Sequence, residues 1–300
     1  MSLKLDHIVI AVHDLEATIA DYTALGFNVQ RGGDHPGRST HNALVVFADG
    51  SYLELIAWKS PAPQERWWQV LQRRGEGLVD FALLPADTAQ TVTQAAQRGL
   101  TLEGQGPLDG GRLRPDGERL HWQTARPTTQ DLPFLCGDIT PRALRVPEGD
   151  ARVHPNGVTG VVSLAIAVKD LDATLTRYRA LLGESPGTHV GRGVTLHARR
   201  DRIALVALGD STLVLNATRP TVLSASVDDE HDIDDEGGDP IARRLAAHGE
   251  GLFHLTLRTT LANAATPSLG LTHGASIDFE RDAAATTNHR LARSAIAEPA

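Results

Sequence analysis

Four side chains that could bind an anion are concentrated in one short stretch: Arg112, Arg114, Arg119 and His121. The turn-forming run 115–117 divides them into two pairs, which predicts a hairpin with one pair on each strand. Residues two apart share one face of a strand, so each pair would be aligned. Guanidinium groups bind carboxylates and phosphates in a bidentate manner, so such a face lining a cavity predicts an anionic ligand. A solvated hairpin is the alternative interpretation.

Two further side chains could move a proton. His41 lies just before the apolar segment 43–47, and its imidazole titrates near neutral pH, so it could act as a general base or donate to a substrate. A hydrogen bond within a loop is the alternative role. Tyr52 opens the next apolar segment and is the second candidate. Cys136 is the only cysteine and is expected to be an inert buried thiol.

The elements that must position these groups belong to a protein of ordinary composition. The chain has 300 residues, 41% of them apolar and 22% charged, and carries a net charge of −8. An acidic chain argues against non-specific binding of nucleic acid and against docking on anionic lipid. A single thiol cannot form an internal disulfide, and no signal peptide or membrane-spanning run is seen, so we expect a cytoplasmic protein. Phosphate-loop, dinucleotide-binding, zinc-finger and serine-hydrolase motifs are absent from the sequence.

An internal repeat is the main structural signal. Residues 12–25 and 168–181 read VHDLEATIADYTAL and VKDLDATLTRYRAL. Each follows a β-branched segment, and the third residue of each is an Asp that could cap a helix. Apolar residues at i, i+4 and i+7 predict a helix that packs one face against a sheet. Pairs of apolar segments at 43–47 and 52–56, and at 204–208 and 213–215, predict a hairpin after each helix.

A weaker pairing extends the pattern to four modules. The tetrapeptide GEGL occurs at 75–78 and 249–252, each time before an apolar segment. A helix is expected over 87–98 after the first copy, whereas Pro267 cuts short the segment after the second. We therefore predict modules at 3–60, 76–139, 158–219 and 249–282, the last with room for only one further strand. These form a first domain over 1–145, a degenerate second domain over 146–282, and a tail over 283–300. The acidic segment 226–239 is expected to be a solvated linker.

The first module resembles a glyoxalase-like domain of the vicinal-oxygen-chelate superfamily. The residues that carry the resemblance are Leu5–Val12 with Asp14-Leu15, and later Tyr52–Ile56. The resemblance implies an α+β fold in which tandem βαβββ modules pair into curled mixed sheets around a small ligand. It covers the first two modules well, the third through the repeat, and the fourth poorly.

The resemblance also implies a metal site. Many members hold a divalent cation with residues from the first and last strands of each module, and His7 and Glu54 occupy these positions in module one. Asp80 holds the first-strand position of module two, so His7, Glu54 and Asp80 form a three-ligand face for Mn, Fe, Ni or Zn. The last strand of module two, 133–136, offers no matching ligand. In the second half only His254 is retained, because Ser163 and Val214 replace the equivalents of His7 and Glu54.

Two functions from different classes remain open. The first is a metal-dependent lyase, isomerase or dioxygenase that acts on a small, oxygenated and anionic metabolite. The second is a metal-free protein that binds or sequesters a small molecule without catalysis. In both, the partner is a small-molecule ligand in the first domain, with no nucleic acid or membrane, and a homodimer is possible because identical elements can be exchanged between copies.

Overall fold

The computed structural model describes residues 3–103, 108–114, 116–183, 201–218 and 239–282. In the first half of the chain the elements run β1 (Lys4–Ala11), α1 (Leu15–Ala24), β2 (Gln30–Asp34), β3 (Thr40–Val46), β4 (Tyr52–Trp58), α2 (Arg66–Arg74), β5 (Gly77–Leu84), α3 (Thr88–Gln97), β6 (Leu108–Leu113), β7 (Arg119–Ala125) and β8 (Phe134–Asp138). A connection with α4 (Arg142–Arg145) and a 3-10 helix (Gly149–Arg152) leads to β9 (Val158–Ala167), α5 (Leu171–Leu182), β10 (Asp201–Leu208), β11 (Ser211–Thr218), α6 (Pro240–His248), β12 (Gly251–Thr259) and β13 (Ile277–Arg281).

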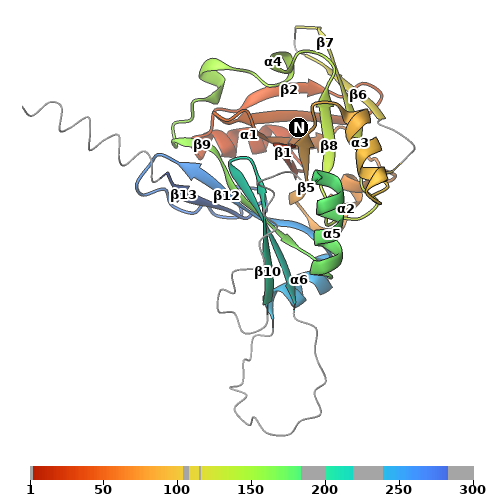
Figure 1. The fold of residues 1–300 in the computed structure, drawn as a ribbon. Helices are drawn as coiled ribbons and strands as arrows, with labels where there is room; N and C mark the ends of the chain where they lie inside the picture. Colours follow the sequence, from red (N-terminus) through yellow and green to blue (C-terminus); the bar gives the residue numbers. More distant parts are fainter. Residues whose placement is uncertain (1–2, 104–107, 115, 184–200, 219–238, 283–300) are drawn as a thin grey trace, which may run out of the picture.

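The strands form two mixed sheets, which confirms the predicted α+β class. The first sheet has eight strands in the order β2-β3-β4-β1-β5-β8-β7-β6, and the second has five in the order β10-β11-β9-β12-β13 (Figure 1). In the first sheet, β1 pairs parallel with β4 and antiparallel with β5, so the first strands of modules one and two meet at its centre. The connections are those of paired βαβββ modules.

Local sequence explains the strand-to-helix turns. Asp14 accepts hydrogen bonds from the backbone N–H groups of Glu16 and Ala17 at 2.9 and 3.0 Å, which caps α1. Asp170 caps α5 in the same way through Ala173 N at 3.0 Å. The predicted helix over 87–98 is α3, which Asp87 caps through Gln90 N at 2.8 Å. The capping residues expected from sequence therefore act as helix N-caps.

The GEGL segments have one structural role in two places. Glu76 accepts a hydrogen bond from His13 N at 2.6 Å, and Glu250 accepts one from Lys169 N at 2.8 Å. Each glutamate thus ties the strand that it introduces to the strand–helix turn of the preceding module. The first glycine of each segment has a positive φ, 78° at Gly75 and 69° at Gly249, a conformation that glycine adopts without steric cost.

The first sheet curls until its edge strands β2 and β6 meet. Arg112 Nη1 on β6 donates a hydrogen bond to the carbonyl oxygen of Gly32 on β2. A Cβ atom at Gly33 would lie 2.3 Å from the carbonyl oxygen of Leu113, so only glycine permits this approach. The sheet therefore encloses a hollow between its two halves.

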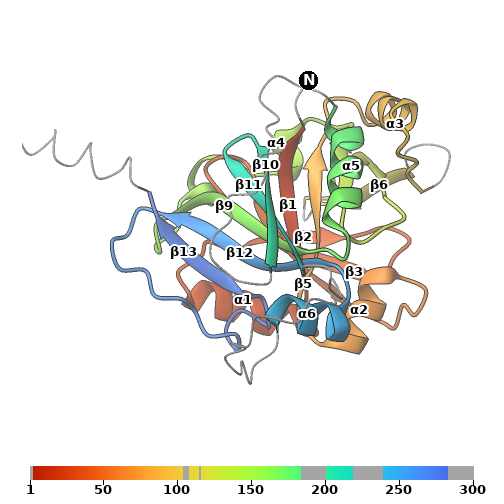
Figure 2. The same ribbon diagram turned by 60° about the horizontal axis from the view of Figure 1, so that its bottom comes forward.

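The two sheets share one hydrophobic core. Ile8 and Leu53 on the outer face of the first sheet belong to the same buried cluster as Leu164 and Leu255 of the second sheet. Helices α3 and α5, one from each half of the chain, lie side by side (Figures 1 and 2). The second half thus covers apolar surface of the first.

Two repeated tyrosines reach across this interface. Tyr22 in α1 donates a hydrogen bond to the carbonyl oxygen of Thr272 at 3.2 Å, and Tyr178 in α5 donates one to that of Asp131 at 3.0 Å. Both side chains are fully buried. Asp131 also accepts from Arg177 and Thr174, so the contacts between the halves combine apolar packing with buried polar groups.

Several elements differ from the sequence-based expectations. The segment with Trp67 and Trp68 is helix α2, and helix α6 follows the acidic segment; neither helix was predicted. The fourth module has the one further strand expected, β13, which pairs parallel with β12 as β8 does with β5. The predicted tail 283–300 and the acidic segment up to residue 238 lie outside the described residues. None of the helices in the described part of the chain has the length and apolar character needed to cross a bilayer.

Candidate functional site

The hollow of the first sheet contains a cavity of about 680 Å³. Its walls come from both modules, because residues on β1, β3 and β4 face residues on β6, β7 and β8. Alternate residues of each central strand point into it, while their neighbours join the shared core, as expected from the two-residue period of a strand. A cavity of this size accommodates a small organic molecule.

His7 and Glu54 face each other in this cavity. His7 Nε2 lies 3.4 Å from Glu54 Oε2, and the two side chains are 4% and 9% exposed. The ring of Tyr52 stacks on the His7 ring at 4.7 Å between centroids, and Phe134 contacts it edge-on at 5.4 Å. The curl of the sheet thus brings together an imidazole and a carboxylate that are 47 positions apart in the sequence.

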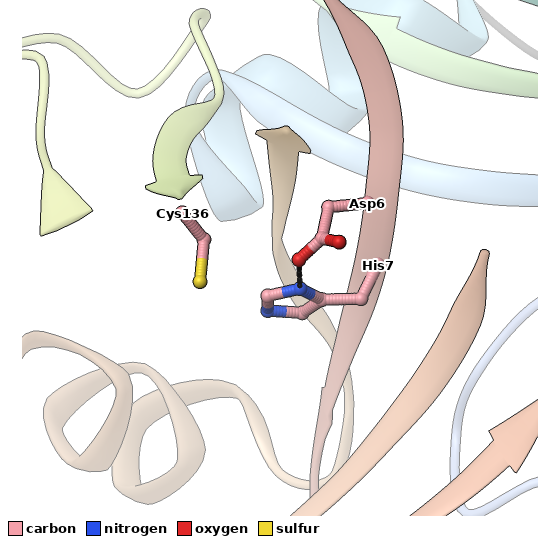
Figure 3. Close-up of side chains that lie close together, drawn as sticks. All are labelled: Asp6, His7 and Cys136. Carbon is pink, nitrogen blue, oxygen red and sulfur yellow. Dashed lines mark hydrogen bonds and ion pairs between the residues drawn. The ribbon is translucent and has the colours of Figure 1, made fainter. Parts of the chain in front are cut away.

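A buried carboxylate fixes the other side of the His7 ring. His7 Nδ1 lies 2.7 Å from Asp6 Oδ2, the hydrogen bond drawn in Figure 3. Asp6 is fully buried and is also bound by Arg145 Nη1 at 2.9 Å and by Arg142 Nη1 at 2.5 Å. Arg145 donates as well to the Tyr52 hydroxyl at 2.6 Å. Helix α4 therefore holds Asp6, which in turn orients the His7 ring.

These contacts shift the protonation of both groups. Burial alone would lower the pKa of His7, but the hydrogen bonds and charges of Asp6 and Glu54 raise it. Burial alone would raise the pKa of Glu54, but His7, His35 and Asn42 bring it down to about 2. Glu54 is therefore ionised at neutral pH, and the raised pKa of His7 shifts its imidazole toward the protonated form.

Two side chains from the β2–β3 region complete the surroundings of Glu54. Asn42 Nδ2 donates to Glu54 Oε1 at 2.6 Å, and His35 Nε2 lies 3.9 Å from the same oxygen. Thr40 Oγ1 lies 2.9 Å from His35 Nδ1 and fixes that ring. Burial lowers the pKa of His35, so this imidazole favours the neutral form. Asn42 Oδ1 is buried without a hydrogen-bond partner.

Arg126 lines the opposite wall of the cavity, and Asp80 lies beside it, outside the lining. Asp80 Oδ2 accepts from Trp67 Nε1 at 2.9 Å and from Arg66 Nη2 at 3.1 Å, while Oδ1 accepts from Phe81 N at 2.9 Å. Arg126 Nη1 lies 3.7 Å from Asp80 Oδ2, outside hydrogen-bond range. Asp80 lies opposite Val9 in the sheet, on the face that carries His7. Its carboxylate, however, is hydrogen-bonded to Trp67, Arg66 and Phe81 N and not to the His7–Glu54 pair.

The other residues singled out from the sequence divide into two groups. Tyr52, Arg112, Arg119 and His121 line the cavity. His41 and Arg114 are outside its lining. His41 precedes the cavity-lining Asn42 on β3, so alternation turns its side chain to the other face of the sheet. Arg114 pairs with Asp116 at 3.0 Å and with Glu118 at 3.3 Å beyond the end of β6.

The second sheet does not repeat the pair. In the first sheet Glu54 lies opposite Val9, and in the second Val214 lies opposite Ala165 at the equivalent register. His254 takes the place of Asp80 beside Ala165. The positions that the sequence repeat aligns therefore also pair equivalently in the two sheets. Where the first sheet has the cavity carboxylate of Glu54, the second has Val214.

Comparison with known proteins identifies the family. The family model described as a glyoxalase-like domain matches residues 5–182. The chain belongs to the glyoxalase-like domain family. No curated protein gives a significant match.

Solved structures share the fold. A hypothetical protein from Staphylococcus aureus is 13% identical, with a TM-score of 0.64, over 93% of this chain and 100% of that one. A mutant of 4-hydroxymandelate synthase from Streptomyces coelicolor is 14% identical, with a TM-score of 0.56, over 87% of this chain and 72% of that one. At these identities the similarity establishes the vicinal-oxygen-chelate fold alone.

The donor set tests whether the divalent metal common in this superfamily fits here. Module one provides two suitable donors, the Nε2 atom of His7 and the carboxylate of Glu54. Module two provides no donor at either of its two expected ligand positions. The carboxylate of Asp80 accepts hydrogen bonds from Arg66 and Trp67, and Phe134 and Arg126 occupy the facing wall. A set of ligands drawn from both modules is therefore incomplete.

A second cluster of potential ligands lies beside the first. The ligand atoms of Asp6, His7 and Cys136 lie within 4.8 Å of one another (Figure 3). The Asp6 oxygens already accept from His7, Arg142 and Arg145. Burial raises the pKa of the Cys136 thiol, which disfavours the thiolate that a metal requires. This cluster is better explained as the support of His7 than as a cation site.

Several residues of the site were not anticipated, among them His35, Asn42, Arg126 and Arg145. Of these four, Asn42 alone has a clear signal in the sequence, because it directly precedes the predicted strand 43–47 and lies two positions before Leu44, which lines the cavity. Arg126 follows the end of β7 and Arg145 lies in the connection to the second sheet. Their positions depend on the path of the chain after the strands end, and the hydrophobic periodicity of the sequence does not predict that path.

Proposed function

We propose that this protein binds a small organic anion in the cavity of the first sheet, with an oxygen atom of the ligand at the His7–Glu54 pair. The observation that carries this proposal is the combination of a buried imidazole–carboxylate pair with arginines in one enclosed space. Arg38, Arg112, Arg119 and Arg126 line the cavity, against the carboxylates of Glu54 and Asp109. The excess of positive charge favours an anionic ligand.

The walls indicate a ligand with an apolar body. The lining includes the rings of Trp67, Trp122, Phe134 and Tyr52 together with aliphatic side chains. Such surfaces bind flat apolar groups, while a few fixed polar groups orient the ligand. His7 Nε2 can donate to a ligand oxygen when protonated, and the Glu54 carboxylate can accept from a ligand hydroxyl. The ligand class is therefore an organic acid that carries a second oxygen function.

Thermal-shift measurements on the full chain test this proposal. We expect hydroxy- and oxo-carboxylates to raise the melting temperature of the wild-type protein, and their neutral amides to have little effect, because bound ligand stabilises the folded state by mass action. His7→Gln should remove the shift. His254→Gln, at the position in the second sheet that corresponds to Asp80, should keep it. A shift that persists in His7→Gln would place the ligand elsewhere.

A second candidate function is favoured by one specific arrangement. Asp6 holds Nδ1 of His7 and leaves Nε2 facing Glu54, as in sites where a carboxylate orients a metal-bound histidine. His7 and Glu54 alone would then hold a divalent cation such as Mn, Fe, Ni or Zn, which supplies Lewis acidity to a bound oxygen in metal-dependent lyases, isomerases and dioxygenases. Metal analysis of protein purified without chelator decides the matter. Stoichiometric metal that is lost in His7→Ala favours the enzyme, and its absence after supplementation removes that candidate.

A further inference from the structure

Arg126 lines the cavity without a hydrogen bond to a carboxylate of the described residues. The Arg126 side chain is 20% exposed, and its nearest carboxylate is Asp80 at 3.7 Å. No side-chain hydrogen bond of Arg126 is found among the described residues. Asp80 instead accepts hydrogen bonds from Trp67, Arg66 and the backbone N–H of Phe81. A guanidinium with five N–H donors is thus held in the cavity wall, and none of these donors is hydrogen-bonded to a residue that the structure describes.

Aromatic rings hold this guanidinium in place. Its central carbon lies 4.6 Å from the centroid of the Trp67 ring and 4.7 Å from that of Phe134. The two rings contact each other at 5.5 Å. Cation–π contacts of this kind stabilise the charge and restrict the side chain, but they leave the N–H edge free to bind a planar anion. The group is therefore preorganised, which reduces the entropy lost when a ligand binds.

Phe134 connects Arg126 to the His7–Glu54 pair. The same phenyl ring lies 4.7 Å from the guanidinium carbon of Arg126 and 5.4 Å from the centroid of the His7 ring. All of these groups line one cavity. A ligand with a single aromatic ring can lie along Phe134 with a polar group at each end.

We infer that Arg126 binds the carboxylate of the ligand, and that the ligand is an aromatic or similarly planar carboxylic acid whose other end reaches His7 and Glu54. This inference rests on the proposed function and adds the ligand class and the residue that selects it. Arg126 serves as the anion anchor, and the carboxylate occupies the N–H edge that Asp80 does not reach.

NMR titration of the full chain with benzoate, and with benzamide as the neutral control, tests the inference. We expect benzoate to shift the Nε–H signal of Arg126 and the ring signals of His7, and benzamide to leave the Arg126 signal unchanged. Arg126→Gln should weaken benzoate binding about tenfold or more, because it removes a charged hydrogen-bonding partner. Arg66→Gln is the matched control, since Arg66 contacts Asp80 outside the cavity lining, and it should retain benzoate affinity.

The outcomes separate this inference from the proposed function. If Arg126→Gln binds benzoate as tightly as the wild type, as judged from the His7 signals, the cavity binds anions but Arg126 does not bind the carboxylate. If benzoate shifts neither His7 nor Arg126, the inference fails, while the proposed function fails only if hydroxy- and oxo-carboxylates also leave the melting temperature of the wild type unchanged. Arg126→Lys keeps the charge without the planar fork, and we expect it to fall between the wild type and Arg126→Gln. The titration of the wild type does not depend on any variant folding.

Discussion

Replacing Glu54 with glutamine should destabilise the protein by an amount that depends on pH. In the folded protein the pKa of Glu54 is about 2, against an ordinary value of 4.5, after His7, His35 and Asn42 have overcome the effect of burial. A carboxylate with a lowered pKa contributes stability that is present above its ordinary pKa and is lost as the pH falls through its folded-state value. Glutamine keeps the shape but loses the charge.

The size of the effect follows from this shift. The difference of about 2.5 pKa units corresponds to roughly 3 kcal/mol of unfolding free energy at pH 7, if glutamine behaves as the protonated acid. At pH 3 the unfolded-state carboxyl is mostly protonated and the folded one is still mostly ionised, so the same shift contributes only about 1 kcal/mol. The destabilisation caused by Glu54→Gln should therefore shrink as the pH falls from 7 to 3.

Urea unfolding of the wild type and the variant at several pH values between 7 and 3 measures this difference. Glu148→Gln is the control, because Glu148 is an exposed carboxylate, 69% accessible, whose nearest arginine nitrogen is 3.6 Å away. It should leave the free energy of unfolding nearly unchanged at every pH. Equal destabilisation by Glu54→Gln at pH 7 and pH 3 would refute the ionised pair and attribute the loss to packing alone.

Two further predictions concern the contacts of the buried Asp6, and a third concerns the core shared by the two sheets. Arg145→Met leaves the buried Asp6 without its main counter-charge and should lower the free energy of unfolding by about 3–5 kcal/mol. Urea unfolding measures this, with Arg152→Met as the control because Arg152 is partly exposed and its carboxylate partner Glu148 is exposed; equal effects of the two variants would contradict it. Asp6→Asn should lower the pKa of His7, because it removes a hydrogen bond and a charge that raise it; NMR titration of the His7 ring in both proteins reports the shift, and an unchanged pKa would show that Asp6 does not act on His7. The fragment 1–145 should aggregate or unfold at lower temperature than the full chain, because Ile8 and Leu53 belong to a core completed by the second sheet; size-exclusion chromatography and thermal unfolding decide, and a stable monomer would indicate that the second half is dispensable for folding.

Much of the fold could be predicted because it is encoded locally. Asp14 and Asp170 signal helix starts through side-chain capping, and the apolar segments signal strands through their composition. The repeat then fixes which segments are equivalent, and the register of Val9 with Glu54 and of Ala165 with Val214 follows that equivalence. Helix α2 was missed because Trp67 and Trp68 gave no helical start signal: Glu65 precedes the helix without a side-chain capping hydrogen bond.

The site was only partly predictable for a different reason. His7 and Glu54 could be located because each lies on a strand whose place in the module is known. The partners that decide their chemistry come from elsewhere: Arg145 from the connection between the sheets and Arg126 from the end of β7. Asp80 shows the same limit, because its strand position was correctly aligned while its hydrogen bonds to Arg66 and Trp67 depend on a helix that the sequence did not reveal. Long-range contacts of this kind are set by the packing of the whole sheet.

The most direct test of the account is a crystal structure of the full chain soaked with 4-bromobenzoate, in which the anomalous signal of bromine locates the ligand. We expect one ligand in the cavity of the first sheet, with its carboxylate on Arg126 and its ring along Phe134, toward His7 and Glu54. Bromine bound only outside this cavity, in protein that binds the compound in solution, would contradict it.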